Sequence, residues 1–144
     1  MGKIQVFLDT NVIISSLISK TGASYQIIRN NDIKKIISQG VLEEVSIVTK
    51  RHDLDTKKIH GIVSQLNCAS ITISKNKITK TYSKYVSDEK DSHIIGATHK
   101  TETKFLITHN IKHFDSDKIN SDLGVIVLKP GNFLQYLRSQ KNEA

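Results

Sequence analysis

The sequence has one cysteine, one proline, no tryptophan and no long hydrophobic run. With Cys68 alone, neither an internal disulfide nor a cysteine-based zinc site can form, and we expect Cys68 to be a small buried apolar residue. No apolar stretch approaches the roughly 20 residues that a membrane-spanning helix requires. Asp9 also interrupts the first apolar stretch before it could serve as a secretory signal. These absences favour an intracellular, cytoplasmic protein that does not associate with a membrane.

Repeats, low-complexity tracts and Gly/Ser-rich or Pro-rich linkers are absent too, so the 144 residues are predicted to form a single domain, 1–144, around one core. Acidic residues are in the minority: 21 Lys and Arg against 14 Asp and Glu leave a net charge of +7. This excess is typical of proteins that bind nucleic acid, although a basic surface can also serve solubility alone. Nucleotide-binding glycine loops and the hydrolase G-x-S-x-G motif are missing, so no motif supports a nucleotide-binding protein or an α/β-hydrolase.

Apolar segments that predict buried strands alternate with segments that predict helices. Strands are expected at residues 4–8, 33–37, 70–73, 104–109 and 123–130, and helices at 10–18, 23–31, 40–50, 55–67, 88–100 and 132–140. This alternation predicts a mainly parallel sheet with helices on both faces. In such sheets ligands bind beyond the carboxyl ends of the strands. The polar residues expected there are Asp9, Thr108, His109 and Asn110.

Two acidic residues are expected to face the interior from the first strand and the third helix. Asp9 ends an apolar strand, where a buried charge is costly unless it is paired or holds a metal. Glu44 falls within the apolar stripe of its helix, which is formed by Val41, Val45 and Val48. Each acid has an ordinary structural explanation as well: Asp9 can cap the helix that follows, and Glu44 can pair with a buried cation.

The helix at 88–100 repeats this pattern. Asp91 shares a face with Ile94, Ile95 and Thr98, and Asp88 lies at the edge of that face. Acids in the first turn of a helix also interact favourably with the helix dipole, so this pair taken alone could be purely structural. These structural explanations account for the acids one at a time, but not for the convergence of three of them in a basic protein.

Converging carboxylates repel one another unless a divalent cation neutralises them. Oxygen ligands without Cys or His select Mg²⁺ or Mn²⁺. A metal ion of this kind activates water and stabilises charge on a phosphate during phosphodiester cleavage, and a basic surface would hold the nucleic-acid backbone. We therefore interpret Asp9, Glu44 and Asp91 as catalytic residues that bind Mg²⁺ or Mn²⁺.

At these residues the sequence resembles PIN-domain nucleases, of the kind found as VapC-type toxins of prokaryotic toxin–antitoxin pairs. The resemblance rests on four motifs in the expected order, FLDTNVIISSL, VLEEVSIVTKR, DEKDSHIIGAT and LITHNIKHF, and the closing VIVLKPGNFLQYL fits the family's last strand and helix. It implies a three-layer α/β/α sandwich and a metal-dependent endoribonuclease. The partners it implies are an RNA substrate, a small antitoxin protein and a second copy of the chain in a homodimer.

The resemblance also implies roles for individual residues. The family's metal ligands carry over to Asp9, Glu44 and Asp91, with Asp88 as an additional acid. Polar positions that brace the site in the family are matched by Asn11 and Thr108.

One position departs from the family pattern. The family's fourth acid often follows a strand in a Thr-x-Asp arrangement, and here Asn110 occupies that place. An asparagine carbonyl can still ligate a cation or hold a water molecule, but the loss of a negative charge should weaken metal binding. Asp115 or Asp117 could compensate from the segment that follows.

Candidate RNA contacts come from two places in the sequence. The segment KNKITKTYSKY, residues 75–85, interleaves lysines with tyrosines, a combination that can track a phosphate backbone and stack on bases. Alternatively, this segment is a solvated loop whose tyrosines pack on the core. The candidates are Lys77, Lys80, Lys84 and Tyr82, together with His109 near the predicted site.

The sequence thus predicts a metal-dependent endoribonuclease that acts as the toxin of a type II toxin–antitoxin pair. Water activated by the metal would attack the phosphorus in line and leave a 5′-phosphate and a 3′-hydroxyl. Two alternatives stay open. A haloacid-dehalogenase-type phosphatase also has an aspartate at a strand end, but it requires a second aspartate where this chain has Asn11. The second alternative is a PIN-like domain that binds RNA or protein without cleavage. Asn110, in place of an acid, is the residue that supports this alternative.

Overall fold

The computed structural model describes residues 3–71 and 74–142, and it contains one five-stranded sheet in which all pairings are parallel. The strands are β1 (Ile4–Leu8), β2 (Ile33–Ser38), β3 (Asn67–Ala69), β4 (Phe105–Ile107) and β5 (Ile126–Leu128). Their order across the sheet is β3-β2-β1-β4-β5. The central strand β1 is covered on both faces, and its residues Val6, Phe7 and Leu8 are fully buried.

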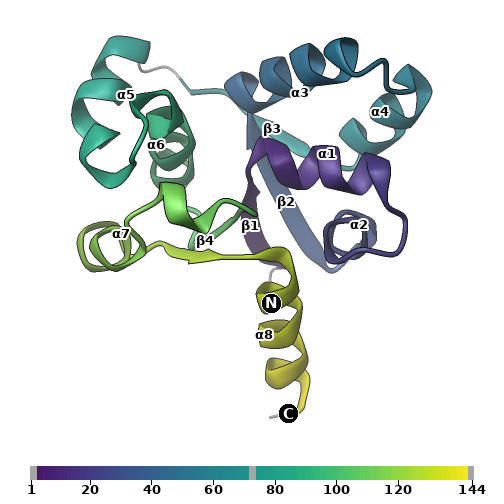
Figure 1. Ribbon diagram of the computed structural model, residues 1–144. Helices are drawn as coiled ribbons and strands as arrows, with labels where there is room; N and C mark the ends of the chain where they lie inside the picture. Colours follow the sequence, from purple (N-terminus) through teal and green to yellow (C-terminus); the bar gives the residue numbers. More distant parts are fainter. Residues whose placement is uncertain (1–2, 72–73, 143–144) are drawn as a thin grey trace.

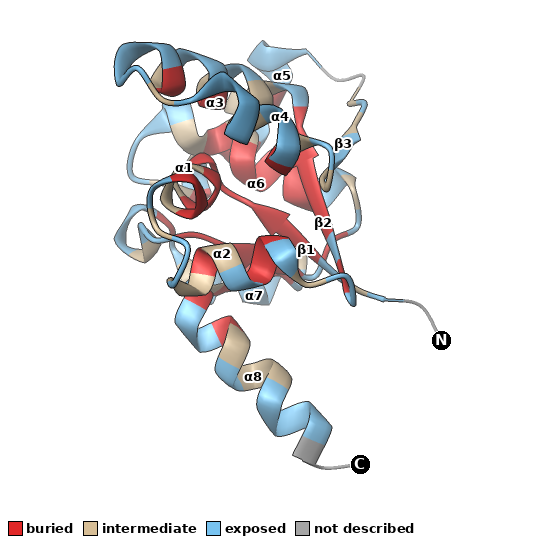
Figure 2. Cartoon of the chain, turned by 90° about the vertical axis from the view of Figure 1, so that its right-hand side faces the viewer, coloured by how far each residue is buried: buried red, intermediate tan, exposed pale blue. Residues whose placement is uncertain are grey.

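Helices cover both faces of the sheet. On one side lie α1 (Thr10–Ile18), α2 (Ala23–Arg29), α3 (Gln39–Arg51) and α4 (Thr56–Val63), and on the other α5 (Lys75–Tyr82), α6 (Ser92–Lys100) and α7 (Ser116–Leu123) (Figure 1). The last helix, α8 (Pro130–Asn142), contacts α2 and then runs away from the sheet. Buried residues concentrate in the sheet and on the helix faces that meet it (Figure 2). The predicted α/β/α sandwich is therefore confirmed.

The strand order creates a switch point beside β1. The chain moves outward from β1 through β2 to β3 and then crosses back to β4, on the other side of β1. In open α/β sheets the helices on either side of such a point diverge and leave a crevice outside the carboxyl ends of the strands. Here the switch point lies between β1, which is followed by Asp9, and β4, which is followed by Thr108.

Two predicted boundaries near the third strand are wrong. The helix expected at 55–67 ends at Val63, where the backbone N–H groups of Gln65 and Leu66 donate to carbonyls three residues earlier, those of Ile62 and Val63, at 2.9 and 3.0 Å. The strand expected at 70–73 is instead β3, which begins at Asn67, and residues 72–73 lie outside the described residues. Cys68 lies on this edge strand and is exposed, so the expectation that it is buried is also wrong.

Two further helices, α5 and α7, were not expected from the sequence. Ser74 caps α5 by accepting from the backbone N–H of Lys77 at 3.3 Å, and Ile78 and Tyr82, one turn apart, face the core. The segment 75–85 is therefore largely helical and not a solvated loop. Helix α7 ends at Gly124, whose left-handed conformation (φ 69°) terminates the helix. Among the described residues, none of the helices combines the length and apolar character needed to cross a bilayer.

Candidate active site

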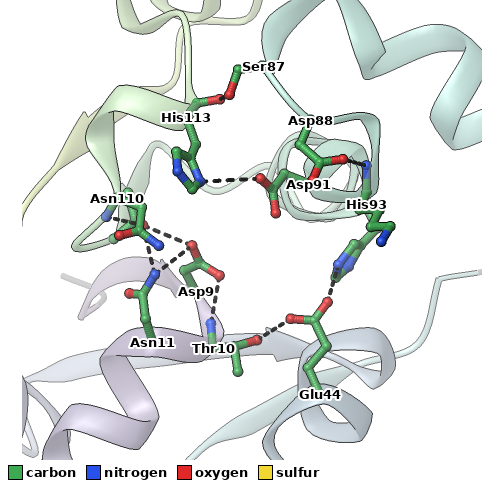
Figure 3. A network of polar contacts seen from close by, with 12 residues as sticks. Asp9, Thr10, Asn11, Glu44, Ser87, Asp88, Asp91, His93, Asn110 and His113 are labelled. Carbon is green, nitrogen blue, oxygen red and sulfur yellow. Dashed lines mark hydrogen bonds and ion pairs between the residues drawn. The ribbon is translucent and has the colours of Figure 1, made fainter. Parts of the chain in front are cut away.

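A cavity of about 490 Å³ opens at the carboxyl ends of β1 and β4. Its polar walls come from four different parts of the chain, and its apolar end is formed by α1 and α3. The polar lining residues near the strand ends are Asp9, Thr10, Asn11, Glu44, Asp91, Asn110 and His113, and Figure 3 shows how they surround one space. Ser15 and Ser19 line the cavity as well. The structure thus brings together the three acids that the sequence analysis selected.

Asp9 is the most buried of the three, with 8% of its surface exposed. It follows β1 directly and is the N-cap of α1, since its Oδ1 accepts from the backbone N–H of Thr10 at 2.7 Å. Its Oδ2 accepts from Thr108 Oγ1 at 2.8 Å and from Asn11 Nδ2 at 3.2 Å. Both oxygens are therefore held in place by the protein.

Asn11 and Thr108 connect the ends of β1 and β4. Besides contacting Asp9, the Asn11 side chain accepts from the backbone N–H of His109 at 3.0 Å. The Thr108 hydroxyl accepts from the backbone N–H of Asn110 at 3.0 Å. These contacts fix the loop after β4 against α1, which is the bracing position that the resemblance implies for the two residues.

Glu44 reaches the cavity from α3. The buried face of this helix was predicted correctly, since Val41 and Val45 are buried, Glu44 is partly buried and Glu43 is exposed. Its Oε2 accepts from Thr10 Oγ1 at 2.8 Å, and its Oε1 lies 2.5 Å from His93 Nε2. Burial by itself raises the pKa of Glu44, but the hydrogen bonds from His93 and Thr10 outweigh it and hold that pKa below its ordinary value. Glu44 is therefore ionised at neutral pH.

Asp91 enters from the opposite side of the cavity. It ends a short 3₁₀ helix, Glu89–Asp91, and precedes α6, so the helix expected at 88–100 begins as a 3₁₀ turn. Its Oδ2 lies 3.6 Å from His113 Nδ1. Burial raises the pKa of Asp91; nearby His113 opposes this shift, whereas Asp88 and Glu44 add to it.

Neighbouring carboxylates disfavour the ionised forms of Asp9 and Asp91. Burial is the largest cause of the raised pKa of Asp9; hydrogen bonds from Thr108 and Thr10 lower it, and the charges of Asp91 and Glu44 raise it again. A cation placed among the three groups would reverse this repulsion. The donor set of carboxylate and amide oxygens is also the one that Mg²⁺ and Mn²⁺ prefer.

The oxygen ligands and the cavity therefore suit a divalent cation, but the side chains are not positioned to coordinate one. In the part of the chain that the structure describes, no three His, Cys, Asp or Glu side chains lie close enough together to hold a metal ion. Glu44 and Asp91 are directed toward His93 and His113, respectively (Figure 3). The three carboxylates would have to move closer together to surround a cation.

The remaining acids named from the sequence lie elsewhere. Asp88 accepts from the backbone N–H of Lys90 at 3.0 Å, which makes it the N-cap of the 3₁₀ helix, and it does not line the cavity. Asp115 is the N-cap of α7, and Asp117 lies in the first turn of that helix. Neither lines the cavity, so they do not replace the charge absent at Asn110, which does line it.

The candidate RNA contacts divide into two groups. Lys77, Lys80 and Lys84 are exposed, as a contact requires. The prediction for Tyr82 is wrong: only 2% of it is exposed, because it packs in the core beneath α6, and its hydroxyl lies 2.7 Å from His99 Nδ1. The His109 side chain bonds to Ser24 Oγ at 3.0 Å and does not line the cavity.

Sequence reasoning missed three residues of the site. Thr10 and His93 hold the Glu44 carboxylate, and His113 faces Asp91. Thr10 could have been found from its place next to Asp9 at the strand end. The roles of His93 and His113 depend on how separate elements pack, and no spacing in the sequence reports this.

Comparisons with known proteins agree with this architecture. The model of the PIN domain matches residues 5–112. A toxin–antitoxin complex from Klebsiella pneumoniae is similar in structure, with a TM-score of 0.65 and 19% identity over 87% of this chain and 97% of that one. VapBC2 from Rickettsia felis, bound to a DNA fragment from their promoter, has a TM-score of 0.64 and 15% identity over 88% of this chain and 98% of that one. No curated protein sequence matches significantly.

At such low identity the two solved structures establish the fold alone. The family model reaches further, because it covers most of the sequence and its matched residues include Asp9, Glu44 and Asp91. With the strand order, the acidic cavity at the switch point and this match in agreement, the chain belongs to the PIN domain family.

Proposed function

We propose that the protein is a divalent-cation-dependent endoribonuclease. The observation that carries this proposal is the meeting of three carboxylates from β1, α3 and the start of α6 in one cavity of a basic PIN-domain protein. A bound Mg²⁺ or Mn²⁺ would activate water and neutralise charge on the phosphate during hydrolysis.

The protein's own residues would hold and orient the reacting groups. Asp9, Glu44 and Asp91 would hold the cation, with the Asn110 carbonyl as a further oxygen donor. Asn11 and Thr108 keep Asp9 in place through their hydrogen bonds to Oδ2, and so limit the reorganisation that the reaction requires. The exposed lysines of α5 would attract the RNA backbone.

We further propose that the protein is the toxin of a toxin–antitoxin pair. Two structurally similar proteins are found in toxin–antitoxin complexes. The cavity is open to solvent beside apolar residues of α1 and α3, among them Ile14, Ile18 and Val48, and Ile18 is strongly exposed. A small partner protein could cover this apolar wall and the acidic cavity at once.

The decisive test is cleavage of a mixed single-stranded RNA pool in EDTA, Mg²⁺ or Mn²⁺. We expect the wild type to cleave only with metal and Asp9→Asn to be inactive. Asp55→Asn is the matched control, because Asp55 also caps a helix, α4, through its side chain but does not line the cavity. This control should cleave like the wild type.

The outcomes separate the proposal from its alternative. Binding of RNA by both wild type and Asp9→Asn, without cleavage in any metal, would favour a PIN domain that binds without cutting. Cleavage that persists in EDTA or in Asp9→Asn would contradict the assignment of the acidic cavity.

A further inference from the structure

His93 joins the two helices that carry the outer carboxylates. It lies on α6, two residues after Asp91, and its Nε2 contacts Glu44 Oε1 on α3. Side chains two residues apart leave a helix in different directions. The start of α6 therefore places Asp91 in the cavity and extends His93 toward the other acid (Figure 3).

Gly40 provides the room for this contact. A Cβ atom at Gly40 would lie 3.0 Å from His93 Nδ1 and 3.4 Å from Cε1. Gly40 does not have a positive φ, so its backbone conformation does not require glycine, and glycine weakens a helix relative to alanine. Gly40 and Glu44 are one turn apart on α3, so the imidazole lies along one face of that helix with Nδ1 near the glycine and Nε2 at the carboxylate.

Glu44 is held at both oxygens. His93 contacts Oε1, and Thr10, the neighbour of Asp9, donates to Oε2 at 2.8 Å. The side chain is 43% exposed and would otherwise sample several rotamers. Each carboxylate oxygen keeps a free lone pair for a further ligand, so these contacts orient the group without blocking it.

Glu44 also forms part of the wall between two cavities. The first is the acidic cavity, and the second, also of about 490 Å³, lies among α3, α5 and α6 and is lined by both Glu44 and His93. Thr10 lines the acidic cavity and His93 lines the second one, so their two contacts hold the Glu44 carboxylate at the boundary between the cavities.

We propose that His93 is a positioning residue that holds Glu44 for cation binding, and that Gly40 is required to admit its ring. This inference rests on the proposed function and adds to it a residue that determines metal affinity. Groups that hydrogen-bond to metal-binding carboxylates orient them, and their loss typically lowers metal affinity by about 10–100-fold.

The experiment measures Mn²⁺ affinity by calorimetry for five proteins of verified fold. Relative to wild type, His93→Ala should bind about 10–100-fold more weakly, and His93→Gln, whose amide can donate from nearly the position of Nε2, should recover most of that loss. Gly40→Ala should weaken binding because the new methyl group displaces the imidazole. Gly61→Ala is the matched control, since a Cβ there meets nothing within 4 Å, and it should bind like the wild type.

A second measurement tests the contact without metal. In EDTA, the effects of His93→Ala and Glu44→Gln on the free energy of unfolding should be non-additive in the double variant, because the two side chains interact. Wild-type affinity in His93→Ala, or equal weakening in the Ala and Gln variants, would overturn the inference, as would strict additivity. A wild type that binds no Mn²⁺ contradicts the proposed function instead, and the unfolding cycle then decides whether His93 holds Glu44.

Discussion

At the scale of single residues, the position of Glu44 was predictable and its partner was not. Helical periodicity alone distinguishes Glu44 from Glu43, because Glu44 lies on the helix face that carries the valines of α3 and Glu43 lies on the opposite face. Asp9 was likewise predictable, because it is a charged residue directly after an apolar strand. His93 lies nearly fifty residues from Glu44 in the sequence, and their contact exists only because α3 and α6 both contact β2 and so lie near each other. Local periodicity carries no information about such a contact.

Asp9 should destabilise the metal-free protein at neutral pH. Its pKa is raised, mainly by burial, so the folded state binds its proton more tightly than the unfolded state does. Stability is therefore lost as the pH rises from the ordinary Asp value through the raised pKa. We expect Asp9→Asn in EDTA at pH 7 to be more stable than the wild type by about 0.5–2 kcal/mol, because the substitution removes a buried charge from a functional site.

Urea denaturation at pH 7 and near pH 4 checks this expectation. The advantage of Asp9→Asn should shrink at the lower pH, which is close to the ordinary Asp pKa of 3.8, because a substantial fraction of Asp9 is then protonated in both states of the wild type. A variant that is less stable than the wild type at pH 7 would show that the hydrogen bonds to the carboxylate outweigh its desolvation.

At the scale of elements, long and periodic segments were predicted well, and short ones were not. Strands β1 and β2 and helices α1 and α3 have apolar patterns that extend over their whole length. Strand β3 has only three residues, and α5 presents only Ile78 and Tyr82 to the core among many lysines. Such short elements depend on tertiary contacts, with β2 for β3 and with α6 for α5, and their intrinsic propensity contributes little to their stability.

The packing of α5 on α6 depends on Gly96. A Cβ at this position would lie 2.8 Å from Ile78 Cγ2 and 3.1 Å from Tyr82 Cδ2, closer than side chains tolerate. Although alanine favours a helix, we expect Gly96→Ala to lower the free energy of unfolding by about 1–3 kcal/mol through overpacking.

Gly61→Ala in α4 is the matched comparison for this substitution. The site is exposed and open, so the helix preference alone should raise stability, by up to about 1 kcal/mol. Chemical denaturation of both variants measures the two effects. A Gly96→Ala protein as stable as the wild type would mean that α5 can move away from α6 without loss.

At the scale of the whole molecule, the α/β alternation predicted the layered fold, and the net charge indicated a polyanionic partner. The location of the RNA path was not predictable, since exposed lysines occur on several faces. Lys77, Lys80 and Lys84 lie on and just after α5, whereas Lys3, Lys34 and Lys104 lie at the amino ends of β1, β2 and β4, the edge of the sheet opposite the cavity.

These two sets of lysines allow a matched test of the RNA path. In the Asp9→Asn background, we expect replacement of Lys77, Lys80 and Lys84 by alanine to weaken single-stranded RNA binding. The slope of log affinity against log salt should fall by up to about 2, because each phosphate contact contributes about 0.7. Replacement of the three lysines at the opposite edge should leave the slope unchanged. Fluorescence anisotropy at several salt concentrations measures both, and equal effects of the two sets would show that only net charge matters.

The central place of β1 also determines when the site can form during translation. Asp9 is synthesised about one hundred residues before Thr108, which holds it and which follows β4. The ribosome must therefore synthesise the chain through β4 before the acidic cavity has both of its sides. A nascent chain that ends before β4 lacks Thr108 and Asn110, so we expect none of the proposed cleavage activity before this point of synthesis.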